Sequence, residues 1–299
     1  MSRIQDLVDR SVLILKEEGI GAFLNRLVRW LGGERRYYNS NVAPAPSKSE
    51  IVPNPEDMQL TTGSTDATAF FKVGEEFLGY FKDWCELEPD DHVLDVGSGI
   101  GRAALPLTKY LNTRGSYDGI EIFRPHVEWC QQNITPQYPN FRFHWADLYN
   151  SMYNREGKYQ PEAYRFPFKD NRFDLVVLMS VFTHLLPHGM ENYLSEISRV
   201  MKKGGYCLIT YFILNPEIEA LIDDPSTQAA FRLPYRYPDQ HYAVEHEGHP
   251  EDVTAYYEAH LRTIYRKYNL EIVEPIRYGI WSARSQHVSF QDIVVGRKV

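Results

Sequence analysis

Cysteine is scarce in this sequence, and its three cysteines lie far apart. Cys85, Cys130 and Cys207 form no Cys-x-x-Cys pair, and an odd, scattered set gives neither a disulfide framework nor a zinc site. The chain also lacks an apolar run of about 18 residues, and its first residues lack the apolar core of a secretory signal. We therefore expect a cytoplasmic protein that neither spans a membrane nor is exported.

An excess of positive charge is absent as well. The chain has 32 Lys and Arg against 40 Asp and Glu, a formal net charge of −8. Proteins that bind nucleic acid normally present a basic face to the phosphates, so we expect no nucleic-acid partner, although a local basic patch stays open. Hydrophobic residues, at 43%, are sufficient for a core, and 21 tyrosines provide rings that can stack on a ligand.

The first 59 residues differ from the rest. Apolar positions at helical spacing predict two short amphipathic helices in an extension over residues 1–37. Residues 38–59 contain four prolines, which indicates a linker. Residues 1–36 carry seven basic and five acidic side chains, and Trp30 follows Arg26 and Arg29. These helices either bind the inner membrane surface or a protein partner, or they pack on the protein's own core.

From residue 60 the chain alternates short apolar runs with longer helical stretches, the pattern of a mostly parallel sheet covered by helices. The seven predicted strands are His92–Val96, Ser116–Ile122, Phe141–Ala146, Phe173–Met179, Gly205–Phe212, Leu270–Arg277 and Ser289–Val295. The predicted helices are Ala67–Cys85, Gly101–Leu111, Arg124–Asn133, Gly189–Met201 and Glu251–Tyr268. Because no helix separates the last two strands, we expect them to form an antiparallel hairpin at one end of the sheet.

A glycine-rich turn follows the first strand. Residues 93–101 read Val-Leu-Asp-Val-Gly-Ser-Gly-Ile-Gly, and glycine allows a positive φ and a close approach of the backbone to a ligand. The third glycine comes one place too early for a dinucleotide-binding turn, and no Gly-Lys-Ser/Thr follows for a phosphate loop. An incidental turn between strand and helix is the alternative.

Acidic residues stand at the ends of the next two strands. Glu121 ends the second strand, where a carboxylate can accept hydrogen bonds from both hydroxyls of a ribose. Its alternative role is that of a solvated surface carboxylate. Asp147 follows the third strand and could instead cap the segment after it.

The run Asp95-x-Gly97-x-Gly99-x-Gly101 resembles the first motif of class I, Rossmann-like S-adenosylmethionine-dependent methyltransferases. Residues 173–185 and 198–205 resemble later motifs of that family in the same order, so the resemblance covers about residues 60–299. It implies a methyltransferase domain over 60–299 with S-adenosylmethionine as cofactor, the turn wrapping its methionine part and Asp147 accepting from the adenine amino group. The cofactor contacts that it implies are Asp95, Gly97, Ser98, Gly99, Gly101, Glu121, Ile122, Asp147, Leu148 and Ser180.

A closer resemblance is to bacterial methyltransferase-domain proteins associated with glycan and polysaccharide synthesis. It rests on residues 129–134, residues 147–150, the Trp-Ser-x-Arg run from Trp281 to Arg284, and Gln291 with Asp292. Ser98 departs from the cysteine that many members of the larger family carry, but both side chains are small.

Methyl transfer is an in-line displacement, so the protein must align the acceptor atom with the methyl group. A hydroxyl acceptor must also lose a proton, and His184, just after the fourth strand, is the candidate base. The alternative is a histidine that only packs or caps the next helix.

An insertion over residues 213–250 is longer than a loop needs and is expected to cap the acceptor. We place Tyr211, Tyr235, Tyr242, Trp281 and Arg284 at the acceptor, although aromatic side chains in a cap can simply pack it together. The spacing of His241, Glu245, His246, Glu247 and His249 fits no metal-binding pattern, so no metal site is expected.

The sequence thus predicts methyl transfer from S-adenosylmethionine to a hydroxyl of a saccharide or another small molecule. Two alternatives stay open. One is methylation of nitrogen or carbon, although the Asn/Asp-Pro-Pro-Tyr motif typical of many N-methyltransferases is absent. The other is a module that binds the cofactor without turnover.

Overall fold

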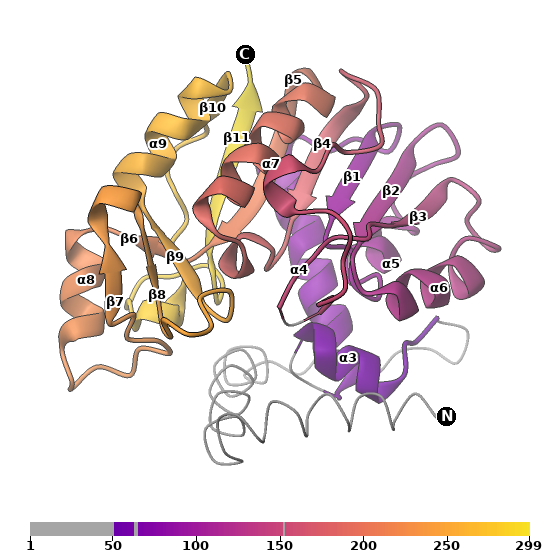
Figure 1. Cartoon of the computed structure of the whole chain (residues 1–299). Helices are drawn as coiled ribbons and strands as arrows, with labels where there is room; N and C mark the ends of the chain where they lie inside the picture. The colour runs from indigo at the N-terminus through magenta and orange to yellow at the C-terminus, as the bar shows by residue number, and fades with distance from the viewer. Residues whose placement is uncertain (1–50, 63–64, 152) are drawn as a thin grey trace.

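The computed structural model describes residues 51–62, 65–151 and 153–299. The two amphipathic helices expected within residues 1–37, and the first part of the expected linker, lie outside these residues. Seven strands form the main sheet in the order β10-β11-β5-β4-β1-β2-β3 (Figure 1). Their bounds are β1 His92–Val96, β2 Ser116–Glu121, β3 Phe141–Trp145, β4 Phe173–Leu178, β5 Met201–Tyr211, β10 Leu270–Ile272 and β11 Asp292–Lys298.

Strands β1 to β5 run parallel to one another, whereas β11 runs antiparallel to both β5 and β10. The predicted fold class, a seven-stranded, mostly parallel α/β sheet with an antiparallel C-terminal hairpin, is confirmed. Strand β10 is shorter than predicted and ends at Ile272. Pro275, three residues further on, has no amide hydrogen for a ladder.

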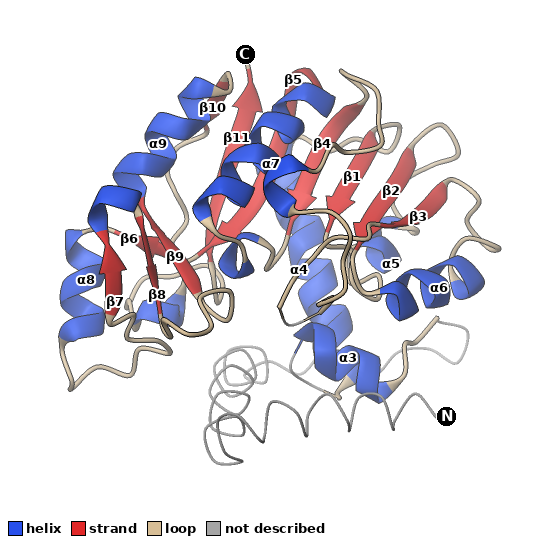
Figure 2. Ribbon diagram, viewed as in Figure 1, coloured by secondary structure: helices blue, strands red, loops and turns tan. Residues whose placement is uncertain are grey.

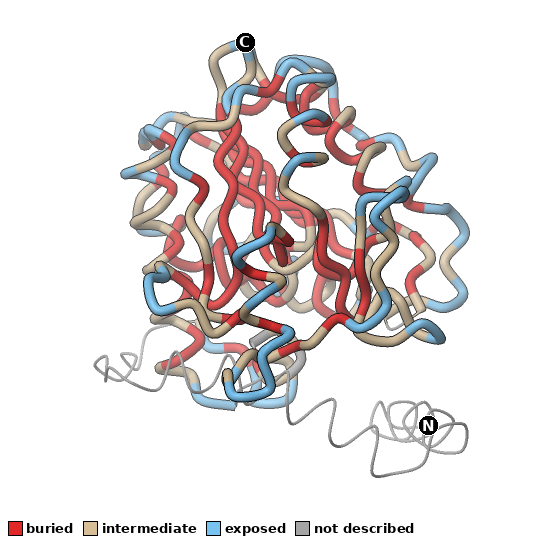
Figure 3. The backbone as a smooth tube through the Cα atoms, turned by 90° about the vertical axis from the view of Figure 1, so that its left-hand side faces the viewer, coloured by how far each residue is buried: buried red, intermediate tan, exposed pale blue. Residues whose placement is uncertain are grey.

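Helices cover both faces of this sheet (Figure 2). One face packs against α4, α5 and α6, and the other against α7 and α9. Alternation along β1 shows why. Val93 belongs to the hydrophobic cluster that includes α4, α5 and α6, and Leu94 belongs to the cluster that includes α7 and α9. Figure 3 shows buried backbone running through the centre of the molecule. The bounds are α4 Ala67–Cys85, α5 Ala104–Leu107, α6 Arg124–Asn133, α7 Pro187–Val200 and α9 Glu258–Lys267.

A short helix lies where the sequence suggested the end of the linker. Helix α3 spans Pro55–Thr62, so the proposed linker boundary at residue 59 falls inside a helix. Asn54 caps it, since its Oδ1 accepts from the backbone N of Asp57 at 2.8 Å. Pro55 has the φ that a first helical turn needs, and Met58 is buried in the core.

The insertion builds a second sheet with strand order β6-β9-β8-β7 (Figure 1). Its elements are β6 Ile213–Leu214, α8 Pro216–Asp223, β7 Tyr235–Tyr237, β8 Tyr242–Val244 and β9 Thr254–Tyr257. The insertion therefore extends to Tyr257 rather than to residue 250, and the helix predicted from Glu251 begins only at Glu258. Residues 254–257 are β-branched or aromatic apart from one alanine, and they pair with β8.

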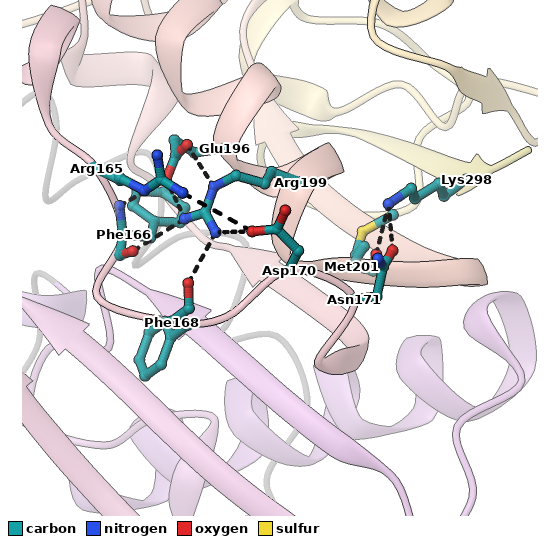
Figure 4. A network of polar contacts seen from close by, with 9 residues as sticks. All are labelled: Arg165, Phe166, Phe168, Asp170, Asn171, Glu196, Arg199, Met201 and Lys298. Atoms are coloured by element: carbon teal, nitrogen blue, oxygen red, sulfur yellow. Dashed lines mark hydrogen bonds and ion pairs between the residues drawn. The ribbon is translucent and has the colours of Figure 1, made fainter.

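Arg199, near the end of α7, fixes the loop that leads into β4 (Figure 4). Its guanidinium donates to the carbonyl oxygens of Phe166 and Phe168 at 3.0 and 2.8 Å, and to the carboxylates of Asp170 and Glu196 at 2.7 and 2.6 Å. This network lies at the end of the sheet where β4 begins. The opposite end, where the parallel strands finish, is the end that carries the glycine turn.

No helix in the described part of the chain is both long enough and apolar enough to cross a membrane.

Candidate active site

The turn after β1 requires glycine at three positions. Gly97, Gly99 and Gly101 have φ values of +84°, +53° and +88°, a region that side chains rarely adopt. A Cβ at Gly97 would lie 2.4 Å from Cγ2 of Val181. The amides of Gly97 and Ser98 both donate to the carbonyl of Ile120, at 2.8 and 3.0 Å, which holds the turn against β2.

Glu121 is bound to the glycine turn. Its side chain is nearly buried, with 9% of the residue exposed, which argues against a solvated surface carboxylate. Its Oε2 accepts from the backbone N of Gly99 at 2.8 Å, and its Oε1 accepts from the backbone N of Phe123 at 2.7 Å. Each carboxylate oxygen can accept a second hydrogen bond, so a diol beside Gly99 would meet a fixed pair of acceptors.

Asp95 is fully buried beneath the same turn. Its Oδ2 accepts from the hydroxyl of Tyr117 at 2.6 Å, while its Oδ1 has no partner among the described residues. Burial raises the pKa of this carboxyl to about 7. The Oγ of Ser98 and the Nε of Arg102 are likewise buried and unsatisfied. Unsatisfied buried polar groups in one place are typical of a site that is completed by a ligand.

Asp147, Leu148 and Ile122 border this region from the ends of β3 and β2. Asp147 is half-buried, its Oδ1 lies 3.4 Å from the amide nitrogen of Asn154, and no helix begins after it, so it does not serve as a helix cap. Leu148 is buried, and Ile122 packs against the hydrophobic cluster that includes α7 and α9.

Ser180, two residues after β4, has a strained conformation. Its φ is +61°, in the left-handed region that few non-glycine residues occupy and that is frequent at functional sites. Its backbone N donates to Oγ1 of Thr210 at 2.8 Å, and its Oγ donates to Oε1 of Gln291 at 3.1 Å. The end of β4 is thereby tied to β5 and to the residue before β11.

His184 closes the short 3₁₀ turn Phe182–His184 that follows β4. Its ring is almost completely buried, and burial lowers its pKa, against the opposing effects of Glu251 and Asp252. Its Nδ1 lies 2.9 Å from the carbonyl oxygen of Glu251. Because a carbonyl can only accept, Nδ1 carries the proton of the neutral ring and Nε2 carries the lone pair.

Two of the expected acceptor residues are fully buried. The hydroxyl of Tyr211 lies 2.9 Å from that of Tyr265, and the Nε1 of Trp281 donates to Oδ2 of Asp292 at 2.8 Å. Neither side chain offers exposed surface to a ligand in this structure.

The other three expected acceptor residues are more accessible and have different partners. Tyr235 is 41% exposed on β7, and Tyr242 stacks on Tyr237 with 4.9 Å between ring centroids. The Nη2 of Arg284 lies 3.1 Å from Oε2 of Glu217, and its guanidinium lies over the ring of Tyr278. These three side chains keep accessible surface in this structure.

Of the histidines considered for a metal, His241 stacks on His260 with 4.2 Å between ring centroids. Across residues 51–62, 65–151 and 153–299, no three His, Cys, Asp or Glu side chains lie close enough together to hold a metal ion.

Two residues at the site carry no sequence motif. Thr61 of α3 covers the glycine turn, since its Cγ2 would lie 3.1 Å from a Cβ at Gly99. Glu251 of the insertion contacts His184. The pair Asn54-Pro55 could have revealed α3, because a capping residue followed by proline is typical of a helix start. No local sequence pattern identifies Glu251 as a residue of the site.

The strand order, the glycine turn after β1 and the acids after β2 and β3 form the arrangement that the resemblance to class I methyltransferases implies. Residues 94–209 match the family model described as a methyltransferase domain. This match runs from β1 almost to the end of β5. The segment is therefore similar to a methyltransferase domain. The glycine turn and the carboxylates of Asp95 and Glu121 would suit S-adenosylmethionine as the cofactor.

Two curated relatives are similar to part of this chain. The chain is 31% identical over 118 residues to phthiotriol/phenolphthiotriol dimycocerosates methyltransferase 1 of Mycobacterium ulcerans. It is 32% identical over 126 residues to demethylmenaquinone methyltransferase of Lactiplantibacillus plantarum. The alignments span 40% and 42% of this chain, and 36% and 47% of the relatives, so less than half of each relative is matched.

Among solved structures, the PH0226 protein of Pyrococcus horikoshii is similar, with a TM-score of 0.51 and 13% identity. The likeness covers 77% of this chain and 92% of that protein. At this identity it concerns the fold alone.

Proposed function

We propose that this protein transfers a methyl group from S-adenosylmethionine to a hydroxyl group of a small molecule, with His184 as the general base. The observation that carries the proposal is the placement of Gly99, Glu121 and His184 at the carboxyl ends of parallel strands, where open α/β sheets bind ligands. The cofactor supplies an electrophilic methyl group when bound. The chain's own task is to align the acceptor oxygen and to remove its proton.

His184 suits a hydroxyl acceptor. Its Nδ1 is engaged by a carbonyl, which leaves Nε2 as the proton acceptor. Its lowered pKa keeps the ring neutral, and hence basic, at pH 7.

The finer proposal is that the acceptor hydroxyl belongs to a saccharide, on the basis of the glycan-associated sequence resemblance. The relatives described above are named for dimycocerosates and demethylmenaquinone instead, so phenolic and quinol acceptors form the second group to test. Methyl-labelled S-adenosylmethionine should be incubated with both groups, and with RNA as a third. We expect a labelled methyl ether together with S-adenosylhomocysteine. Cofactor binding without transfer to any acceptor would favour a non-catalytic module.

Cofactor affinity is expected to rise with pH because of Asp95. Its pKa of about 7 in the free protein means that this carboxyl is largely protonated at pH 6 and largely ionised at pH 8. A cationic sulfonium ligand favours the ionised form, so a proton is released on binding and affinity increases about tenfold from pH 6 to pH 8. Titration calorimetry in buffers of different ionisation enthalpy measures both effects. Asp95→Asn should lose this part of the pH dependence, and an identical dependence in the variant would rule out Asp95 as its source.

We also propose that residues 1–36 attach the protein to an anionic membrane surface or to a membrane-bound partner. The support is their net positive charge, seven basic against five acidic side chains, and Trp30 near two arginines. Deleting residues 1–50, which leaves α3 intact, should reduce cosedimentation with anionic vesicles and leave cofactor affinity unchanged. Equal sedimentation of both forms, with a lower melting temperature of the truncated one, would show that the segment packs on its own core.

A further inference from the structure

Glu251 lies where three segments of the chain meet. It belongs to the loop between β8 and β9 of the insertion. Its carbonyl oxygen accepts from Nδ1 of His184 at 2.9 Å. Its carboxylate Oε2 accepts from the backbone N of Ser151 at 2.9 Å and also from the Ser151 hydroxyl. Since His184 follows β4 and Ser151 follows β3, one residue of the insertion joins two loops at the carboxyl end of the main sheet.

The loop that Glu251 holds is also the loop that carries Asp147. The described residues 147–151 and 153–159, here called the β3 loop, contain two bridges, one between Leu148 and Tyr159 and one between Asn150 and Asn154. Asn154 points its amide nitrogen at Asp147, 3.4 Å away. A shift of the β3 loop would therefore move Asp147, the expected adenine contact, and also the contact with Glu251 beside His184.

We infer that Glu251 is a positioning residue. Its carboxylate binds Ser151 and so joins the β3 loop to the insertion, a contact called the latch below. The latch holds the backbone carbonyl of Glu251 at Nδ1 of His184. The inference rests on the proposed role of His184. Two effects follow from the latch. It fixes the tautomer of the ring, with the proton on Nδ1, and it keeps water away from the ring.

The electrostatic surroundings of His184 agree with this role. Backbone hydrogen bonds of Glu251 and Asp252, together with the charges of their carboxylates, favour the protonated form of the ring. The ring of Tyr153 lies edge-on to it, 6.3 Å away between centroids. Burial outweighs these opposing effects and lowers the pKa. Opening the latch hydrates the ring and removes that dominant effect, so the pKa of His184 rises toward its ordinary value.

The first test is hydrogen exchange of the Ser151 amide in the full chain. Glu251→Ala removes the acceptor, and exchange should accelerate about tenfold, the effect of losing one ordinary hydrogen bond. Glu251→Gln keeps an oxygen able to accept both donors and should exchange like the wild type. Glu247→Ala, in the same loop, is the matched control, because Glu247 accepts from the exposed hydroxyl of Tyr237 at 3.0 Å and not from Ser151. Equal exchange in all four proteins would overturn the latch.

The second test is the titration of His184 followed by nitrogen resonances of the imidazole ring. In the wild type and in Glu251→Gln we expect protonated Nδ1, whereas Glu251→Ala should show mixed tautomers and a higher pKa. An unchanged ring in Glu251→Ala, despite faster exchange at Ser151, would overturn the coupling. If Glu251→Ala does not fold, Ser151→Ala, which removes only the hydroxyl donor, should produce the same changes to a smaller extent, and no change in it would also overturn the latch.

Both readouts are independent of the acceptor. If the wild type shows the latch but His184→Ala keeps full turnover, the proposed base is wrong and the latch stands. If His184 proves to be the base while Glu251→Ala matches Glu247→Ala in both measurements, the latch is wrong and the proposed function stands.

Discussion

Gly99→Val is expected to weaken binding of S-adenosylmethionine and S-adenosylhomocysteine by at least about 100-fold, close to abolition. A branched side chain at φ +53° is strained by roughly 1–2 kcal/mol before any contact is counted. Its Cβ would press on Thr61, 3.1 Å away, and its branches would occupy the surface where the backbone must approach the ligand. The strain also displaces the Gly99 amide that Glu121 holds at 2.8 Å, so the methionine and ribose contacts are lost together.

The matched control for this variant is Gly79→Val. Gly79 lies within α4, and a Cβ there would meet no atom within 4 Å. This control should bind the cofactor with wild-type affinity. Titration calorimetry measures binding, and thermal unfolding shows whether each variant is folded. Wild-type affinity in folded Gly99→Val would remove the glycine turn from the cofactor site.

The geometry of the proposed cofactor site was predictable because its residues are encoded locally. Gly97, Gly99 and Gly101 alternate along one short turn. The positive φ at these positions favours glycine over other residues. Glu121 and Asp147 were found by counting strands, since the carboxyl ends of parallel strands meet at one edge of the sheet. Short apolar runs bounded by polar residues gave the strands that place them.

The acceptor half was less predictable because it depends on contacts between distant parts of the chain. Glu251 meets Ser151 across 100 residues and His184 across 67, and no spacing rule links such positions. Tyr211 and Trp281 were selected for their ring chemistry, which suits packing as well as ligand binding, and both are fully buried. Proline content predicted a linker up to residue 59, although the cap at Asn54 starts a helix at Pro55.

The two halves also differ in how they are held. Backbone amides and buried carboxylates fix the glycine turn to the sheet itself, so its geometry follows from the fold. His184 is oriented by a carbonyl of the insertion instead. Substitutions in the insertion should therefore alter turnover and acceptor choice more readily than they alter cofactor affinity.

His184→Ala is expected to lower turnover by about 10²–10⁴-fold, the range for loss of a general base, with cofactor affinity unchanged. The base works only when neutral, so wild-type activity should fall on the acid side as the ring becomes protonated. Because burial lowers the pKa of His184, this fall should come below pH 6.5. His184→Ala should lack this acidic limb. The matched control is His188→Ala at the exposed start of α7, which should keep both the rate and the limb. The measurement is the pH dependence of turnover for the three proteins, with an acceptor that the labelling experiment identifies. A folded His184→Ala protein with wild-type turnover would make the ring a packing residue.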